Sequence, residues 1–445
     1  MKNLENDFLY INSLATGIGS NDIGLDRGQL GNERIVHFRK VGNKLLLIQP
    51  NYSFRAKSKN LAERNSIEQA FAKSVIHGFK IIETIDEKYL IDFTPFLMID
   101  RHGVANRLKV LKQGAYKVDL TKSAIALERT KSFPKNSEFE SLLTFSGNPT
   151  GKLITSGVSP DPANISVVQH HSFIELPDNF YKPREFDPRS GAISISYLDY
   201  ATPVQENIEK KYIIRHRLEK VNPSLELSEA KDPIIYYLDP GTPEPVKSAL
   251  LEGARWWNQA YEDIGFKNAF QVKMLPEDVD PMDCRYNVIQ WVHRSTRGWS
   301  YGASVVDPRT GEIIKGHVSL GSLRIRQDFL IAQALLNKPF ENDDNYQPML
   351  DMAIARIKQL SAHEVGHTIG FAHNFAASTT NRSSVMDYPH PLIKLDNGEV
   401  NLNDAYATGI GDWDKVTVAY SYSQFSSANE KEELDAILDL SLIHI

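Results

Sequence analysis

Short stretches with the pattern of β-strands dominate the first half of the chain. The stretches 34–41 and 44–48 flank Gly42-Asn43, a two-residue turn that predicts a β-hairpin. A second hairpin is predicted around 86–88. The remaining predicted elements are strands at 192–198 and 212–217 and one helix at 61–76. We therefore predict that residues 1–225 form a mainly β region, and the sequence assigns this region no role.

The pattern changes after a polar stretch bounded by prolines, 222–233, which we interpret as a linker. Residues 242–265 carry an apolar stripe spaced by three and four residues, with Thr242-Pro243 at its start and Gly265 at its end, which predicts a helix. Strands are predicted at 234–238, 270–274, 286–292, 303–306 and 312–320, and helices at 322–337, 348–370 and 429–440. This mixture predicts an α+β domain over residues 226–445.

Composition narrows the class of protein. The chain has 445 residues, 41% hydrophobic and 24% charged, which is ordinary for a globular protein and excludes disorder as its main organisation. A net charge of −6 argues against a nucleic-acid partner bound through a basic surface. The single cysteine, Cys284, cannot form an internal disulfide. No apolar run approaches the ~18 residues of a membrane span. The first twenty residues have no continuous apolar stretch, so we expect no signal peptide in them, and either the protein is cytoplasmic or this chain lacks its natural start.

The helix predicted at 348–370 carries the most informative motif, His363-Glu364-Val365-Gly366-His367, followed by Gly370 and His373. Two histidines four residues apart lie about 40° apart around a helix and roughly 6 Å apart along it, so both imidazoles can reach one ion. Glu364 lies about 100° round the helix and can stand beside a metal without ligating it, where a general base belongs. Gly370 tolerates the positive φ that ends a helix, and the turn can return His373 to the same ion.

We therefore predict that His363, His367 and His373 bind one Zn²⁺. Three protein ligands leave a fourth position for water, which is typical of catalytic rather than structural zinc sites. The two-histidine pattern alone is moderate evidence, because a solvated helix face can carry two unrelated histidines. The extended pattern fixes five positions with suitable residue types, so chance becomes a poor explanation.

A second motif follows at Ser384-Val385-Met386-Asp387-Tyr388. The extended histidine motif followed by a methionine-containing turn resembles the pattern of the metzincin zinc proteases. This resemblance implies that Met386 forms an apolar floor under the imidazoles, whereas an isolated methionine would indicate ordinary core packing. The order Ser-x-Met-x-Tyr is similar to that of astacins and serralysins, which implies that Tyr388 can ligate zinc and swing out to stabilise the tetrahedral intermediate. A tyrosine that only anchors the surface is the alternative.

Three other segments, 297–302, 307–317 and 406–411, resemble a family of large, mostly uncharacterised bacterial zinc-dependent metalloproteases with a metzincin-type catalytic domain. The resemblance runs from about residue 180 to 423 and implies a twisted mixed sheet with an active-site helix. Family members are usually exported and longer at both ends. We therefore expect export to the periplasm, the cell surface or the medium, and a chain that is truncated at its C-terminus.

Motif and resemblance together predict a zinc-dependent endopeptidase that acts on a protein or peptide. Zinc-bound water is expected to attack the scissile carbonyl, Glu364 to take its proton and pass it to the leaving amine, and zinc with Tyr388 to stabilise the oxyanion. An edge strand, 303–306 or 312–320, is expected to pair with extended substrate, as the resemblance implies. The alternative is a non-catalytic surface-binding protein with a residual zinc site, and an intact Glu364 speaks against it. The sequence predicts no oligomeric state.

Weaker signals come from four further positions. His170-His171 and His317 are expected to face solvent on their strands. Cys284 is expected to be a buried free thiol. Residues 307–311 are expected to form an Asp-Pro turn rather than a calcium site.

Overall fold

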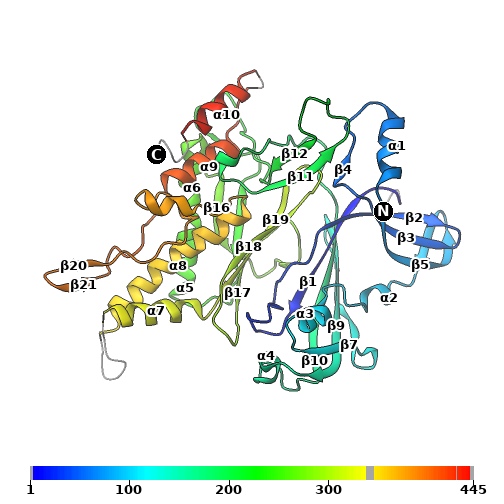
Figure 1. Cartoon of the computed structure of the whole chain (residues 1–445), viewed down its shortest axis with the longest axis horizontal. Helices are drawn as coiled ribbons and strands as arrows, with labels where there is room; N and C mark the ends of the chain where they lie inside the picture. The colour runs from blue at the N-terminus through cyan, green and yellow to red at the C-terminus, as the bar shows by residue number, and fades with distance from the viewer. Residues whose placement is uncertain (1–3, 337–344, 427, 441–445) are drawn as a thin grey trace.

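The computed structural model describes residues 4–336, 345–426 and 428–440, and it combines helices with strands. Its first half is mainly β, as predicted (Figure 1). Within the described residues, nine strands form one sheet in the order β6-β5-β3-β2-β1-β10-β9-β7, with β8 paired to β9. The strands are β1 (Phe8–Thr16), β2 (Arg34–Val41), β3 (Lys44–Gln49), β5 (Ser74–Ile85), β6 (Lys88–Ile91), β7 (Gly114–Val118), β8 (Ala124–Ser132), β9 (Asn136–Pro149) and β10 (Asn164–Ile174). The helices of this half are α1 (Leu61–Ala70), α2 (Thr94–Leu97), α3 (Val104–Val110) and α4 (Lys152–Thr155).

Both predicted hairpins are present. β2 and β3 pair around Gly42-Asn43, and β5 and β6 pair around Asp86-Glu87. Gly42 has a φ of +57°, which glycine adopts without steric cost. The helix predicted at 61–76 is shorter than expected, because α1 buries none of its residues and the chain joins β3 as strand β5 from Ser74.

A small sheet in the order β12-β11-β4 also lies in the first half of the chain. It consists of β4 (Phe54–Arg55), β11 (Ser194–Asp199) and β12 (Glu209–Ile213). The strands predicted at 192–198 and 212–217 are therefore shifted. Their outer residues pair elsewhere, since Ala192 bridges to Phe371 and Arg215 bridges to Glu312.

The second half contains a five-stranded sheet in the order β16-β14-β17-β19-β18. It consists of β14 (Ile234–Leu238), β16 (Phe270–Met274), β17 (Asn287–Val292), β18 (Tyr301–Val306) and β19 (Ile313–Gly321). The ladders are parallel except for β18, which runs antiparallel to β19. The helices are α5 (Val246–Arg255), α6 (Trp257–Asp263), α7 (Arg324–Leu335), α8 (Gln347–Thr368), α9 (Asp412–Tyr422) and α10 (Glu430–Leu438). The single helix predicted at 242–265 is thus two helices, because the Trp256 N–H bonds to the Gly253 carbonyl, three residues back, and breaks the α-helical pattern.

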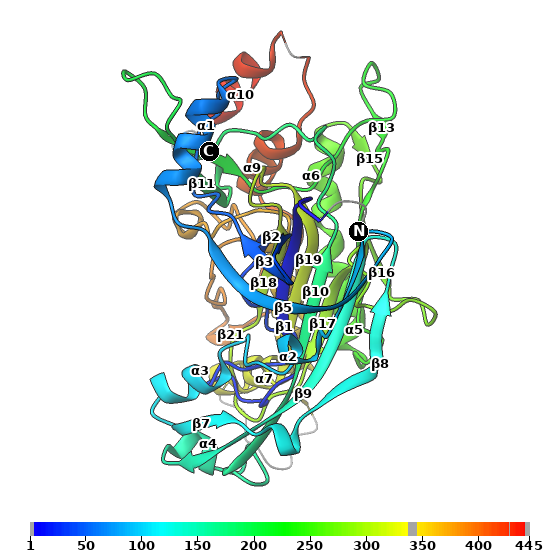
Figure 2. The same cartoon turned by 90° about the vertical axis from the view of Figure 1, so that its right-hand side faces the viewer.

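The five-stranded sheet is buried on both faces (Figures 1 and 2). On one face α8 packs against β18 and β19 and against α5, and Ile289, Trp291 and Val318 of the sheet join this core. On the other face Val305 packs with Leu9 of β1. The first sheet is therefore a layer laid over the second. The packing of the first sheet over the five-stranded sheet brings together segments distant in the sequence, so no local sequence pattern predicts it.

The expectation that three histidines face solvent is wrong. His171 is fully buried and hydrogen-bonds through Nδ1 to the Tyr10 hydroxyl at 2.9 Å. His170 contacts Glu138 and Glu140, and although burial lowers its pKa, the bonds and charges of these two carboxylates raise it to about 9. His317 is also buried, because β19 lies under the first sheet rather than at the surface.

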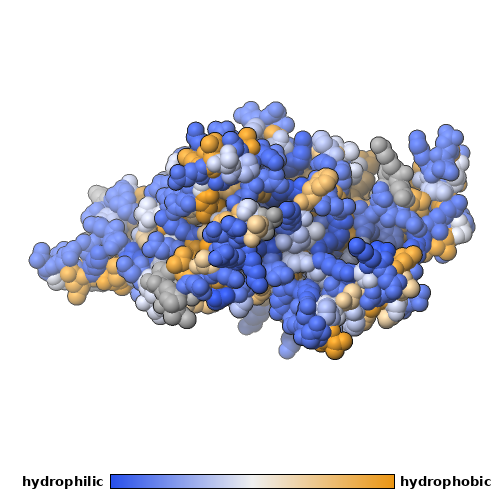
Figure 3. All heavy atoms as spheres, turned by 90° about the horizontal axis from the view of Figure 1, so that it is seen from above, coloured by the Kyte–Doolittle hydropathy of each residue, from blue (hydrophilic) through white to orange (hydrophobic). Residues whose placement is uncertain are grey.

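Other expectations are confirmed. Cys284 is a buried free thiol, and residues 307–311 form a turn in which the Thr310 N–H bonds to the Asp307 carbonyl. Two short strand pairs complete the described structure, β13 (Ser228–Glu229) with β15 (Phe266–Lys267) and β20 (Lys394–Asp396) with β21 (Glu399–Asn401). Among the described residues, no helix combines the length and the hydrophobicity needed to cross a membrane. Figure 3 shows one face of the molecule, where hydrophilic residues predominate and hydrophobic residues form small scattered groups.

Candidate metal centre

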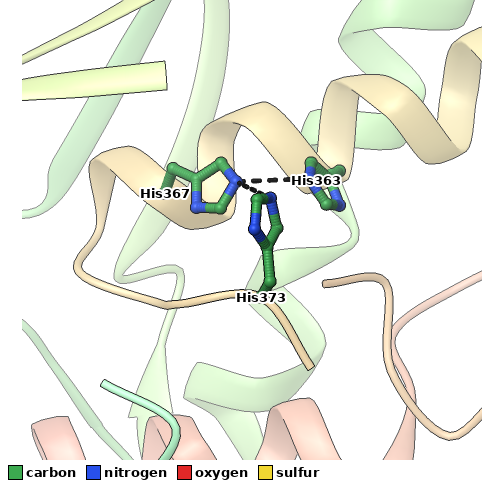
Figure 4. A group of neighbouring side chains, drawn as sticks. All are labelled: His363, His367 and His373. Atoms are coloured by element: carbon green, nitrogen blue, oxygen red, sulfur yellow. Dashed lines mark hydrogen bonds between the residues drawn. The ribbon is translucent and has the colours of Figure 1, made fainter. Parts of the chain in front are cut away.

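The three predicted ligand histidines converge (Figure 4). His363 and His367 lie one turn apart near the end of α8, and their Nε2 atoms are 3.2 Å apart. His373 approaches from the segment after the helix, and its Nε2 lies 3.0 Å from that of His367. Among the described residues these three side chains form the group able to hold a metal ion, with all potential ligand atoms within 4.8 Å of one another.

The turn that returns His373 depends on Gly370. Its φ is +105°, and a Cβ at this position would overlap the carbonyl oxygen of Ile214. The segment 191–193 holds the turn on both sides, because the Ile193 N–H bonds to the Gly370 carbonyl at 2.8 Å and the Ala372 N–H bonds to the Gly191 carbonyl at 2.9 Å. A side chain at position 370 would therefore be both strained and obstructed.

Hydrogen bonds to backbone carbonyls assign the tautomers of the two helical imidazoles. His363 Nδ1 lies 2.8 Å from the Val385 carbonyl, and His367 Nδ1 lies 2.8 Å from the Phe371 carbonyl. Because carbonyls only accept, each Nδ1 carries the proton and each Nε2 carries a lone pair. Two facing lone pairs at 3.2 Å cannot bond to each other, whereas a cation between them can bind both. Tetrahedral zinc with nitrogen ligands at about 2.0–2.1 Å sets those nitrogens about 3.3–3.4 Å apart, so the donor set fits zinc.

Burial keeps these imidazoles neutral. It lowers the pKa of His363 to about 3, helped by the nearby His367, and lowers the pKa of His367 to about 4. Burial also lowers the pKa of the more exposed His373. Since a metal binds only the neutral form of imidazole, all three side chains are ready to ligate at neutral pH.

Met386 packs beneath the helix that carries the histidines and is 2% exposed. A Cβ on Gly366 would overlap its sulfur and would lie 2.7 Å from Cζ2 of Trp257. Trp257 is itself fixed by a bond from its indole N–H to the Ala362 carbonyl at 2.8 Å. The glycine inside the histidine motif therefore lets the methionine and the tryptophan reach the helix backbone.

Asp414, at the start of α9, holds the methionine-containing turn. Its buried carboxylate accepts bonds from the Ser384 hydroxyl at 2.6 Å, the Val385 N–H at 2.8 Å and the Gly411 N–H at 2.9 Å. The Val385 carbonyl in turn accepts the Nδ1 proton of His363. Asp414 thus orients a ligand histidine through one intervening residue.

Glu364 is buried, 4% exposed, and lies outside the three-histidine group found in the described part of the chain. Burial raises its pKa to about 8, while the charge of Arg356 and the Gly302 N–H act in the opposite direction. Arg356 is also buried, and lies 5.7 Å from the ring centroid of Tyr406. The region behind the carboxylate is therefore positively charged.

Tyr388 lies on the open side of the histidines and is 54% exposed. Its ring centroid is 4.9 Å from that of His363 and 4.6 Å from that of His373. Phe375, which is 59% exposed, adjoins both His373 and Tyr388 at 5.2 and 5.7 Å. Two exposed aromatic rings therefore border the candidate metal centre.

Strand β18 forms the edge of the sheet beside α8, and in the described residues β19 is its strand partner. Of the two edge strands nominated from the sequence, 312–320 is wrong, because β19 lies between β17 and β18. The far end of β18 is covered, since the Val306 N–H bonds to Glu33 at 3.0 Å. The free edge is thus limited to 301–304, next to Glu364.

The sequence reading missed three residues at this site, Asp414, Arg356 and Phe375. An aspartate in the first turn of a helix is a recognisable signal of a helix start. No nearby residue, however, indicates that Asp414 accepts a hydrogen bond from a turn 29 residues earlier. Arg356 lies two turns before Glu364 and reads as a solvent-facing helix residue. Phe375 has no distinguishing pattern.

Two family models match parts of the chain. Residues 28–221 match a model described as a domain of unknown function (DUF5117), and residues 345–442 match a model described as Met-zincin. No curated protein matches the chain. The Met-zincin match covers the histidines, the methionine-containing turn and α9. Match and geometry together support a metzincin-like domain in the second half of the chain, with a histidine group that could hold a metal ion.

Proposed function

We propose that this chain is a zinc-dependent endopeptidase. The observation that carries the proposal is the convergence of the Nε2 atoms of His363, His367 and His373, two of them fixed as lone-pair donors by carbonyl acceptors. The Met-zincin match over the same residues supports a metallopeptidase. Internal cleavage of a polypeptide, rather than trimming of its ends, is the finer part of the proposal.

In this proposal the three histidines hold zinc, with Met386 packed beneath their helix. When bound, zinc supplies a Lewis acid and lowers the pKa of a water molecule to about 7. Glu364 is the general base: its carboxylate accepts a proton from the attacking water and returns it to the leaving amine. Burial makes this carboxylate a stronger base by raising its pKa to about 8, and the charge of Arg356 acts in the opposite direction by favouring the ionised form.

Tyr388 is proposed to donate a hydrogen bond from its hydroxyl to the oxyanion that develops on the scissile carbonyl. Its ring is exposed beside His363 and His373, so the side chain has room to reorient. The alternative role, a tyrosine that only anchors the surface, predicts no effect of its hydroxyl on turnover.

An extended peptide is proposed to pair with the free edge of β18 at 301–304. This stretch adjoins Glu364, because the Gly302 N–H interacts with that carboxylate. Phe375 would border the bound peptide on the opposite side.

Residues 226–445 are proposed as the catalytic unit. Within residues 1–225, the sheet of residues 8–174 covers the sheet of this unit, and the segments at 191–193 and Ile214 support the turn at Gly370. Export, as the family resemblance implies, belongs to the same proposal.

The test is the Glu364→Gln variant, which keeps the shape of the side chain and removes its basicity. It should retain zinc and lose peptide hydrolysis by orders of magnitude, measured with a peptide library read by mass spectrometry. Turnover close to that of the wild type would rule out the base. A wild-type protein that binds zinc but cleaves no peptide or casein, with or without chelator, would favour the surface-binding alternative.

A further inference from the structure

A cavity of about 180 Å³ lies apart from the metal centre. It is lined by the segment 180–184, by residues 215–219, and by residues 422–425 with Glu430. None of its lining residues belongs to the histidine site. Its lining contains more basic side chains than carboxylates. The basic residues are Lys182, Arg184, Arg215 and Arg217, and the acidic residues are Glu219 and Glu430.

Arg215 brings a buried charge to this cavity without a counter-ion. Its side chain is 9% exposed, and no ion pair within the described residues includes it, whereas neighbouring Arg217 pairs with Glu312 at 2.8 Å. One Nη donates to the Lys182 carbonyl at 3.0 Å, and the guanidinium lies 5.3 Å from the ring centroid of Tyr181. Its buried Nε–H finds no acceptor among the residues that the structure describes.

Arg184 adds a second charge to the same place. It is 6% exposed and donates to the carbonyls of Tyr420 and Ser423 at 2.5 and 2.9 Å, which ties it to the end of α9. Its ion pair with Glu430, at 3.0 Å, is to a half-exposed carboxylate. In the described part of the chain its own Nε–H has no acceptor, and the hydroxyl of Tyr181, which is 7% exposed, donates its proton to none.

We propose that this cavity binds a small oxyanion, held by Arg184, Arg215 and Tyr181. A buried charge without a partner is costly, and an anion would compensate it while accepting the unmatched donors. The planar guanidinium fork suits phosphate and carboxylate oxygens. The cavity corresponds to about six water volumes of ~30 Å³, enough for an ion of phosphate size with remaining water.

The site joins segments that are far apart in the sequence. Arg184 precedes α9 by some 200 residues yet donates to the Tyr420 carbonyl near its C-terminal end, and Arg215 lines the same cavity as Tyr422. An anion that binds only the folded chain stabilises it by RT ln(1 + L/Kd), where L is the concentration of free anion. The expected consequence is a melting temperature that rises with the logarithm of the oxyanion concentration above the Kd.

The probes are inorganic phosphate, sulfate and acetate, each titrated against chloride at constant ionic strength, because salt also screens charges nonspecifically. Equilibrium dialysis with labelled phosphate should give one bound ion per chain beyond any that the metal centre takes up, and this part should persist in the His363→Ala variant. A stronger effect of phosphate and sulfate would identify a tetrahedral anion, and a stronger effect of acetate a carboxylate. No saturable binding of any of the three would overturn the proposal.

Arg215→Gln removes the unpaired charge and keeps a shorter, polar side chain. It should weaken phosphate binding roughly 10- to 100-fold, and Tyr181→Phe about 2- to 10-fold. Arg189→Gln is the control, because Arg189 lies outside the cavity, is half-exposed and is already paired with Asp187. If Arg215→Gln does not fold, Tyr181→Phe carries the test. Phosphate binding that is unchanged in either folded variant would contradict the site.

Discussion

The carboxylate of Asp414 accepts a hydrogen bond from the Val385 N–H at 2.8 Å, and this contact joins α9 to the turn beneath the histidines. The carbonyl of the same residue, Val385, accepts hydrogen bonds from His363 Nδ1 at 2.8 Å and from the Gln359 amide at 2.9 Å. Because this fixed carbonyl holds the Nδ1 proton of His363, Nε2 stays free to bind a metal.

Asp414→Asn should therefore weaken zinc binding. Val385 and Gly411 donate to one carboxylate oxygen and the Ser384 hydroxyl to the other, so the amide can keep an oxygen for the two N–H groups only by turning its NH₂ towards Ser384, which then loses its acceptor. The substitution also removes the negative charge that these donors face. Loss of such supporting contacts typically costs 10- to 100-fold in metal affinity, measured here by competition with a chromogenic chelator. Asp412→Asn, an exposed neighbour on the same helix, is the control. Equal affinities of the two variants would show that Asp414 does not position the histidine.

Gly366→Ala should destabilise the fold without touching a ligand. The added methyl group would meet the sulfur of Met386 and Cζ2 of Trp257, and both are buried. Overpacking of this kind costs about 1–3 kcal/mol, to be measured by urea denaturation. Met386→Leu conserves volume and should cost less than about 1.5 kcal/mol. A Gly366→Ala protein as stable as the wild type would mean that the methionine moves freely out of the way.

Tyr388→Phe removes only a hydroxyl from an exposed ring. If that hydroxyl stabilises the oxyanion, kcat should fall by roughly 10²–10³, by analogy with the removal of other oxyanion donors. Zinc content and thermal stability should stay at wild-type values. A kcat equal to that of the wild type would leave the tyrosine with a purely structural role.

The zinc-free protein should lose stability as the pH falls from about 6.5 towards 4. Burial lowers the pKa of five histidines to about 3 or 4, namely His171, His216, His317, His363 and His367. In this window the unfolded chain, with histidine values near 6.5, binds protons that the folded chain does not, so acid favours unfolding by up to about 1.4 kcal/mol per pH unit for each group. Urea titrations at pH 7 and pH 5 measure the difference.

His317→Gln isolates one of these groups away from the metal centre. It should make the pH dependence shallower by up to one proton on unfolding, whatever its effect on stability at pH 7. An unchanged slope would mean that His317 takes up its proton equally in both states. With zinc present, protons must also displace the metal, so its release should accompany acid unfolding.

The sequence predicted the features that depend on residues close together in the chain, and it missed those that depend on distant segments. The spacing of His363 and His367 and the glycine at position 370 act within about ten residues, so local backbone geometry was sufficient to bring the histidines together. The hairpin at Gly42-Asn43 was predicted for the same reason. The burial of His317, in contrast, depends on a sheet formed by residues 8–174, which covers β19 from a distant part of the chain.

The same distinction explains the errors in element bounds. Ala192 and Arg215 look like parts of regular strands, but each pairs with a segment more than 90 residues away, next to the metal centre or to β19. Asp414 is similar, because its role arises from the docking of α9 against the turn. Contacts that bring distant segments together decide which polar residues support the site, and a single sequence contains no direct signal for them.

Zinc content by mass spectrometry of the purified chain tests the central claim most directly. The account predicts one zinc ion per chain in the wild type, and a sharp loss in His363→Ala, His367→Ala and His373→Ala, each compared with His390→Ala, an exposed histidine outside the group. Because each ligand supplies one of three nitrogens, no single replacement should retain full occupancy. Wild-type zinc content in all three variants, or a wild-type chain that binds no zinc when it is supplied in excess, would contradict the account.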